Sequence, residues 1–560
     1  MRRTIFVLAA LVAASTSLAQ ARTAHAFCGF YVAPPGDKPL YNDASLVALM
    51  REGTRTVMSM SNNYKGPAKN FAMVVPVPVV LQKDNVRTLS PAAFEKLEKL
   101  TAPRLVEYWE TDPCDHPCAD ADLGSICGVG YGAGYGGLGM GSGGYSPVTI
   151  EAKFSVGEYD IVILGAKDSD SLEKWLKDNG YAIPDGAAAA LAPYVKEQQK
   201  FFVAKVDVKK VKMDKAGVAV LSPLRIAFES PDFRLPVRLG LLNAQAKQDL
   251  IVFVLSPDKR YDVANYPNVF APTNLEVTND ARKSFAPFYA TLFDASIAQV
   301  GGRAIVTEYA WESSSCDPCP TPPLEDDDVA TLGGDVIYGD GAGKMKVSKK
   351  GNTSMVITRL HARYDRTSLD EDLIFRAAPP ITGGREDDVG DGTIATTAQP
   401  SSYNNFQARY VIRHLWTGPI GCKNPQRGAW GDRPAWMKSA PDPTSATGLA
   451  GASRGTVQLA SVLKGGMPKV EIVTASSFAE GGDDGGDGGD AGGDAATSSA
   501  TSDASFTGGD GSTMVPPVPP GPRGCGCAIP GKTSPESTSI AWLSIALGSA
   551  LFERRRSHKR

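Results

Sequence analysis

The sequence has 560 residues, which is too long for one ordinary domain. With 42% hydrophobic and 21% charged residues, its composition is typical of a globular protein. The formal net charge of −3 provides no basic surplus to neutralise phosphates, so the composition argues against a nucleic-acid-binding protein.

Residues 1–26 predict a secretory signal peptide. Two arginines precede an apolar run from Ile5 to about Ala14, and small residues suited to signal peptidase follow. Cleavage after Ala26 is favoured over cleavage after Ala21, because little structure could begin in the short stretch between them. A permanent membrane anchor would need about 20 apolar residues, more than this run supplies. We therefore expect an exported protein that signal peptidase processes.

Residues 27–222 are expected to form an α+β domain. The stretches 54–62 and 70–80 have the composition of strands. Pro76 and Pro78 favour a sheet edge or an irregular extended segment for the second stretch, since proline cannot donate a hydrogen bond to a neighbouring strand.

Two helices are predicted in this domain. The first begins at Pro91 with Ser90 as its cap, and three apolar residues share one face: Phe94, Leu97 and Leu100. Pro103 interrupts the pattern, so residues 102–110 are predicted as a second helical piece or a kinked continuation. The second helix covers 170–180, with Gly180 as its terminator and Leu172, Trp175 and Leu176 facing inward. Strands are predicted at 157–166 and 201–213.

Residues 223–475 are expected to form a second, strand-rich domain, with the boundary near Ser222. One helix is predicted at about 279–295. Strands are predicted at 223–230, 234–242, 248–256, 303–311, 355–364 and 469–477. Because strands outnumber helices and hairpin-like spacing dominates, the fold class is predicted as α+β with largely antiparallel sheets.

The C-terminal part of the chain has a different composition. Residues 476–530 are rich in glycine, aspartate, serine and proline, which predicts a disordered acidic linker. Residues 531–560 contain an apolar segment, Ser537 to Phe552, followed by a basic end. This arrangement predicts a membrane-associated tail whose basic side stays inside.

The tail resembles the MYXO-CTERM sorting signal of myxobacterial surface proteins. The resemblance rests on the Gly-Cys doublet at 524–527, the short apolar segment and the arginine cluster. It implies that a sorting protease processes the chain near the doublet and leaves it at the cell surface or outer membrane. Cys525 or Cys527 would then be the processing or attachment cysteine.

Several motifs of known chemistry occur in contexts that do not suit them. Residues 526–533 match a phosphate-binding loop, but a proline-rich linker stands where that loop needs a buried strand. Residues 451–455 match a nucleophile elbow, but the only later histidine is His558 in the tail. Residues 128–147 contain G-x-G-x-x-G and are expected to form a glycine loop. The Gly/Asp repeats at 483–494 are interpreted as solvated linker.

Closely spaced cysteines are the strongest candidates for covalent chemistry. Seven cysteines lie in the exported region: Cys28, Cys114, Cys118, Cys127, Cys316, Cys319 and Cys422. Disulfides are the first hypothesis in an oxidising compartment. A zinc site at Cys114, Cys118 and Cys127 with His116 would require ligands that are too close along the chain. A redox pair at Cys316 and Cys319 would need a helix, and prolines follow instead. The zinc site and the redox pair stay open as alternatives, and structural disulfides are the favoured hypothesis.

His361 and His414 lie on predicted strands, where a satisfied sheet histidine is more common than a catalytic one. No catalytic, cofactor-binding or metal-binding residue is assigned.

Three segments, 46–89, 101–114 and 223–241, are similar to the bacterial family called domain of unknown function 2330. The resemblance extends from Cys28 to the middle 300s and brings no established activity. We expect an exported, surface-anchored protein of unknown biochemical activity, which works without catalysis as a binding or structural protein of the envelope. An exported hydrolase-like enzyme with a site invisible to motif analysis is the alternative.

Overall fold

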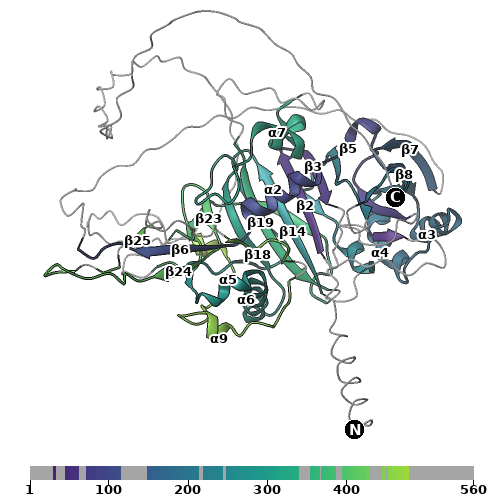
Figure 1. Cartoon of the computed structure of the whole chain (residues 1–560). Coiled ribbons are helices and arrows are strands. Elements are labelled where there is room, and N and C mark those ends of the chain that lie inside the picture. Colours follow the sequence, from purple (N-terminus) through teal and green to yellow (C-terminus); the bar gives the residue numbers. More distant parts are fainter. Residues whose placement is uncertain are drawn as a thin grey trace, which may run out of the picture. The chain divides into compact units, whose positions relative to one another are not determined.

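The computed structural model describes most of the chain between Phe30 and Phe478 (Figure 1). The described residues are 30–32, 44–61, 71–114, 148–213, 219–243, 247–339, 354–365, 367–385, 394–425, 427–428, 430–431, 444–449 and 452–478. The predicted signal peptide, the glycine loop, the acidic linker and the sorting tail lie outside the described residues.

An eleven-stranded mixed sheet forms the centre of this unit (Figure 1). Its order is β22 (Gln399–Pro400), β21 (Ile381–Gly383), β23 (Asn405–Gln407), β18 (Ile305–Glu312), β19 (Val356–Tyr364), β14 (Gln248–Ser256), β2 (Ala44–Glu52), β3 (Arg55–Ser61), β12 (Leu224–Glu229) and β5 (Val86–Thr88), with β16 (Asn268–Phe270) beside β18. β14 is buried along its whole length, as its unbroken apolar run leads one to expect.

The parallel pairing of β2 with β14 joins the two halves of the chain. Asp249 faces Ala44 and Leu255 faces Met50 in the register of the two strands. On the other side of β2, β3 pairs with β12. The hydrogen-bonded sheet therefore runs across the domain boundary expected near Ser222, and strands from both sides of it share one core.

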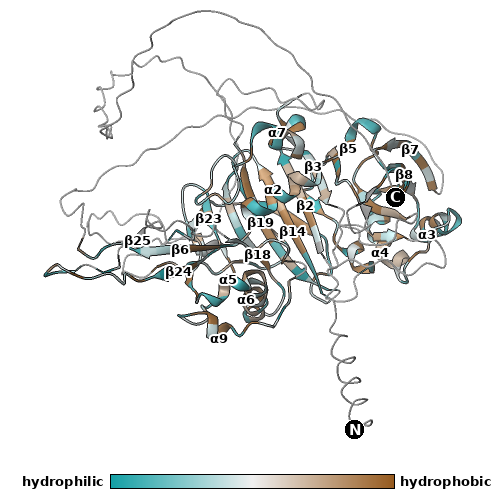
Figure 2. Cartoon of the chain, in the orientation of Figure 1, coloured by the Kyte–Doolittle hydropathy of each residue, from teal (hydrophilic) through white to brown (hydrophobic). Residues whose placement is uncertain are grey.

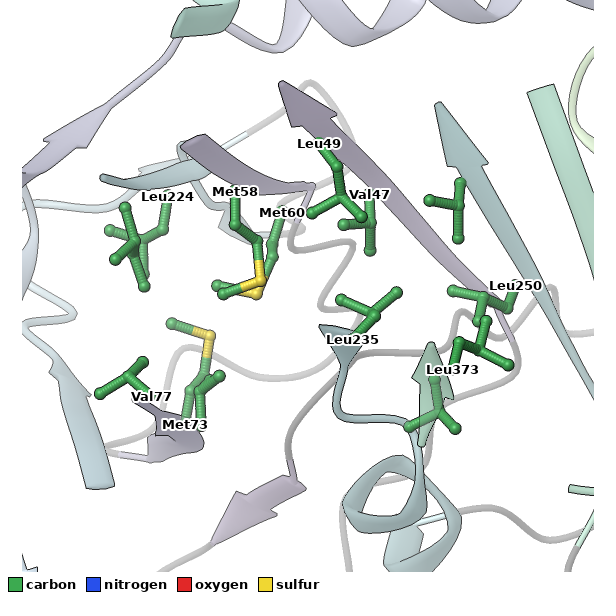
Figure 3. Close-up of a cluster of buried hydrophobic side chains, with 14 of the residues drawn as sticks. Val47, Leu49, Met58, Met60, Met73, Val77, Leu224, Leu235, Leu250 and Leu373 are labelled. Atoms are coloured by element: carbon green, nitrogen blue, oxygen red, sulfur yellow. The ribbon is translucent and has the colours of Figure 1, made fainter. Parts of the chain in front are cut away.

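A second, five-stranded sheet packs against one face of the central sheet. Its order is β1 (Phe30–Val32), β4 (Ala72–Val77), β9 (Lys200–Val206), β8 (Tyr159–Ala166) and β7 (Val148–Val156). Figure 3 shows the apolar side chains of β2, β3 and β12 facing Met73 and Val77 of β4. The two inner faces form the largest apolar cluster of the described residues.

Helices cover the outer faces of both sheets. α2 (Pro91–Thr101) packs Phe94, Leu97 and Leu100 against the central sheet, beside α7 (Asp326–Val329), η3 (Ala330–Gly334) and α8 (Asp335–Ile337). α3 (Ser169–Asp178) and α4 (Ala187–Lys196) cover the five-stranded sheet. The strands between these layers are mostly brown in the hydropathy colouring of Figure 2.

A third apolar cluster surrounds α6 (Phe285–Gln299), which follows α5 (Asp280–Lys283). Here α6 packs on β24 (Arg409–His414) and β6 (Arg104–Glu110), which pair in parallel. The same sheet contains β17 (Leu275–Glu276), β25 (Trp430–Gly431) and β26 (Thr444–Ser445). β6, β24 and β25 lie together at the left of Figure 1.

The smaller elements complete the described secondary structure. They are η1 (Lys83–Asn85), β10 (Lys212–Met213), β11 (Ala219–Val220), β13 (Arg234–Leu235), η2 (Arg238–Asn243), β15 (Arg260–Val263), β20 (Leu373–Ala378), α9 (Leu459–Val462) and η5 (Ala475–Phe478). The strand-rich α+β class is confirmed, while the sheets are partly mixed because β2, β14, β6 and β24 pair in parallel. No helix among the described residues is long and apolar enough to cross a membrane.

The prediction of a helix at 102–110 is wrong, because residues 104–110 form strand β6. Its hydrogen-bonding partner is β24, some three hundred residues later, where Arg409 faces Arg104. A strand that depends on so distant a partner leaves little signal in the local pattern. β6 and β18 each lead into a loop that contains a cysteine, Cys114 after β6 and Cys316 after β18.

Two predicted strands are also wrong in part or whole. Residues 234–242 contain only the short β13 before Pro236, after which the chain forms the 3₁₀ helix η2. Residues 469–477 form no strand, although the Val473 amide donates to the Asn268 carbonyl at 2.8 Å.

The stretch at 70–80 is a strand inside the sheet, but β1 covers only Ala72 to Val74. Among the described residues, Pro76 therefore has a strand partner only on the β9 side, where it faces Phe201.

Gly333 provides a test of how the α7–α8 segment is seated on the sheet. Its φ is +134°, and a Cβ atom there would lie 2.7 Å from Cβ of Val57. We expect Gly333→Ala to lower the free energy of unfolding by about 3 kcal/mol, because backbone strain and a clash with the Val57 side chain combine. Gly53→Ala, at φ +56° with open space around it, is the matched control and should cost only about 1 kcal/mol. Equal losses in denaturant melts of the two variants would contradict this packing.

Candidate functional site

His361 lies at the centre of a buried network of charged and polar side chains. It stands on β19 and is 1% exposed. Its Nδ1 lies 2.7 Å from Oε1 of Glu308 on β18, and its Nε2 lies 3.0 Å from Oδ1 of Asp249 on β14. Three adjacent strands thus bring one imidazole between two carboxylates, and the ring of Phe293 on α6 stacks on it at 4.1 Å between centroids.

Glu308 is fully buried and has three partners besides the backbone. Arg359 Nε donates to its Oε2 at 2.5 Å, and the Tyr289 hydroxyl on α6 donates to Oε1 at 2.6 Å. Arg359 and His361 occupy alternate positions of β19, so both side chains reach the same face of the sheet. The Glu308 carboxylate therefore receives hydrogen bonds from two cationic groups and one phenol.

The network continues from Asp249 towards the surface. Arg454 donates to Oδ1 of Asp249 at 2.5 Å and to Oδ1 of Asp294 at 2.7 Å. Arg363, the next inward position of β19, also bonds Asp294. Asp294 belongs to α6, and Arg454 belongs to the segment after the central sheet. The charged chain therefore connects three strands, one helix and one late loop.

The charges of the network shift the pKa values of its central members. Burial alone would raise the pKa of Glu308, but the charges of His361 and Arg359 outweigh it and lower the pKa to about 2. Burial alone would lower the pKa of His361, but the charge of Glu308 and the hydrogen bonds to Asp249 and Glu308 raise it. Burial and the neighbouring carboxylate raise the pKa of Tyr289. The favoured state is a doubly hydrogen-bonded imidazolium between two carboxylates.

This geometry suits structural cross-linking better than proton transfer. A general base needs one unprotonated ring nitrogen directed at a nucleophile or substrate. Both ring nitrogens of His361 are instead directed at carboxylates, and the site is buried. Breaking one partner of such a network leaves an uncompensated buried charge, which costs several kcal/mol.

His414 occupies a separate and more exposed environment. It ends β24, where its Nε2 lies 2.8 Å from Glu107 on β6 and its ring stacks on Trp109 at 4.7 Å. Arg282 also bonds Glu107. The structure therefore gives His414 and His361 different partners and does not combine them into one site.

Two disulfides fasten loops that follow equivalent strand ends. Cys114, just after β6, is bonded to Cys422, which lies 308 residues later in the chain. Cys316, after β18, is bonded to Cys319. The sequence had no signal for the first pairing, because it depends on the parallel alignment of β6 and β24. Among the described residues, no group of three or more histidine, cysteine or acidic side chains is arranged to hold a metal ion.

The remaining predicted sites lie outside the described residues. They are the candidate disulfide cysteines Cys118 and Cys127, the cleavage site at Ala26, and the sorting cysteines Cys525 and Cys527. Glu308, Arg359 and Asp249 could not be recognised from the sequence as partners of His361. The available signal was the alternation of Arg359, His361 and Arg363 on one strand, which places three cationic side chains on one face.

Comparison with known families identifies the chain. A profile described as "Uncharacterized protein conserved in bacteria (DUF2330)" matches residues 22–376. The chain belongs to this family. The match includes the strands that carry Asp249, Glu308 and His361, but ends before β24 and Arg454. No curated protein and no solved structure matches the chain.

Replacing Glu308 tests how much the His361 network contributes to the free energy of unfolding. Glu308→Gln keeps the shape but removes the charge that balances Arg359 and His361, so we expect a loss of about 3–5 kcal/mol in the free energy of unfolding. Glu312→Gln, an exposed change on the same strand, is the control and should alter stability by about 0.5 kcal/mol or less. Denaturant melts compare the two, and a small loss for Glu308→Gln would show that the network contributes little.

The pH dependence of stability tests the charge on His361. Since its pKa is raised on folding, its contribution is fully present below the ordinary value of 6.5 and is lost as pH rises through the folded value. The stability difference between the wild type and His361→Gln should therefore shrink as the pH rises above the ordinary value of 6.5. Denaturant melts at several pH values measure it. A difference that grows with pH would mean that the buried ring is neutral.

The pKa of Glu308 determines how the stability of the protein changes at acidic pH. Its folded pKa of about 2 lies below the ordinary 4.5, so its contribution is present above 4.5 and lost as pH falls towards 2.

Proposed function

We propose that this protein is exported and held at the cell surface, where it acts without catalysis as a binding or structural component of the envelope. The observation that carries this proposal is the pair of disulfides, Cys114–Cys422 and Cys316–Cys319. Disulfides persist in oxidising compartments and are rare in the cytosol. They agree with the signal peptide that the sequence predicts at residues 1–26.

The C-terminal sequence supports surface attachment. The proposed order is a folded part ending near Phe478, an acidic Gly/Asp/Ser/Pro linker to residue 530, and the short apolar tail with its basic end. The similarity of Gly524 to Arg560 to a MYXO-CTERM signal supports processing by a sorting protease at Cys525 or Cys527. The linker would then act as a flexible spacer between the envelope and the folded part.

The environment of His361 supports a non-catalytic role. Its ring nitrogens are both directed at carboxylates, and its neighbours Glu308 and Arg359 are fully buried. An exported hydrolase is the alternative function, and it would need a different set of residues as its nucleophile and base. No observation in the described residues favours that alternative over the first.

Replacement of the sorting cysteines tests the surface proposal. In the double variant Cys525→Ser/Cys527→Ser we expect loss of surface attachment and retention in the membrane or release to the medium. Protease shaving of intact cells followed by quantitative mass spectrometry measures it. Cys316→Ser/Cys319→Ser is the control, because it removes two cysteines without touching the tail. Unchanged surface abundance of the tail variant would contradict sorting through these cysteines.

A further inference from the structure

A second group of buried charges lies apart from the His361 network. Arg104 and Arg409 stand opposite each other in the parallel register of β6 and β24, and are 0% and 2% exposed. Within the described contacts, neither guanidinium pairs with a carboxylate. Two like charges are thus buried side by side, an arrangement that is unfavourable unless an opposite charge or many hydrogen bonds compensate it.

The acceptors that these arginines do have are neutral. Arg104 donates to the carbonyl oxygens of Pro318 and Leu100, the latter at 2.8 Å. Arg409 donates to the carbonyl oxygen of Asp317 and, at 3.4 Å, to the hydroxyl of Tyr108. Burial, with a smaller contribution from the charge of Arg409, lowers the pKa of Arg104 to about 10. The charge of Asp317 opposes this lowering, but among the described residues no carboxylate forms an ion pair with either guanidinium.

Three buried donors of this group, one of them on Tyr309, lack a hydrogen-bond partner among the described residues. The Tyr309 hydroxyl is buried without a hydrogen bond, as are the Nε atoms of Arg104 and Arg409. Tyr309 is 1% exposed, and burial raises its pKa while the nearby charges of Arg104 and Arg409 oppose that rise. A phenol and two guanidiniums therefore lie within electrostatic reach of one another, with donor capacity left over.

One short loop covers the pair. Asp317 and Pro318, whose carbonyl oxygens bond the two arginines, are flanked by the disulfide between Cys316 and Cys319. The Asp317 carboxylate is directed away, to Arg385. The loop therefore presents two neutral oxygens at positions where a ligand's charged oxygens could form stronger hydrogen bonds with the same guanidiniums.

We propose that Arg104, Arg409 and Tyr309 form a binding site for a small oxyanion, a carboxylate or a phosphate, which the 316–319 loop covers in the present structure. Paired arginines bind such groups through bidentate, charge-assisted hydrogen bonds. Binding displaces the loop carbonyls, and the Cys316–Cys319 disulfide restrains that movement. The site is independent of where the protein resides, so its test does not depend on the surface proposal.

Anion-dependent stabilisation of the purified full chain is the first measurement. Sodium phosphate and sodium acetate are titrated separately against sodium chloride at constant ionic strength, and the melting temperature is followed. A ligand that binds only the folded state raises that temperature with its concentration. A rise with phosphate, acetate or both supports the site and identifies the preferred oxyanion. No rise with either overturns the proposal.

Variants then locate the site. Arg409→Gln should raise the dissociation constant of the anion about 100-fold. Tyr309→Phe, which removes one hydroxyl, should raise it about tenfold. Arg234→Gln changes an arginine that pairs with Glu197 and Asp232 and has no bond to the loop, and it should leave the constant within about twofold. If Arg409→Gln does not fold, Tyr309→Phe decides. Equal anion affinity in wild type and Tyr309→Phe would place binding elsewhere and overturn the assignment.

Opening the cover gives an independent result. In Cys316→Ser/Cys319→Ser the loop is no longer closed, so its carbonyl oxygens compete less with the anion. We expect this variant to bind the preferred anion at least about threefold more tightly, consistent with a modest loss of restraint. Weaker binding in this variant would contradict a covering role for the loop.

Discussion

The ion pair of Glu308 with Arg359 and His361 is the interaction on which the arrangement of this protein depends most. The three residues lie on neighbouring strands in the middle of the largest sheet, where their side chains are buried from solvent. Because a lone buried charge is so unfavourable, β18 and β19 can place these side chains inside only in the register that brings them together. Asp249 on β14 extends the same constraint to a third strand.

The network also fixes elements outside the sheet. Tyr289 and Asp294 attach α6 to it, and Arg454 attaches a segment from near the end of the folded part. The apolar faces of α6 supply most of the burial in this region, but apolar contacts alone leave alternative orientations of similar energy. The charged contacts select one of them. This explains how a region rich in non-local strand pairs acquires a single arrangement.

The sequence predicted those features that depend on local chemistry. Ser90 caps α2 and accepts from the Ala92 amide, and Leu172 and Leu176 are buried on α3, as their spacing indicated. Features that depend on distant partners were not predictable. β6 was taken for a helix because its partner β24 lies far along the chain, and His361 was treated alone because its carboxylates come from other strands. The strand alternation of Arg359, His361 and Arg363 was visible, but its meaning required the register.

The central claim is that His361 is a buried imidazolium held between Glu308 and Asp249. Nitrogen NMR of protein labelled in the histidine rings measures it directly, with His361→Gln identifying the signal. We predict that both ring nitrogens carry hydrogen and that the titration midpoint of His361 lies above the ordinary 6.5. A neutral ring with one bare nitrogen, or a midpoint at or below 6.5, would contradict it.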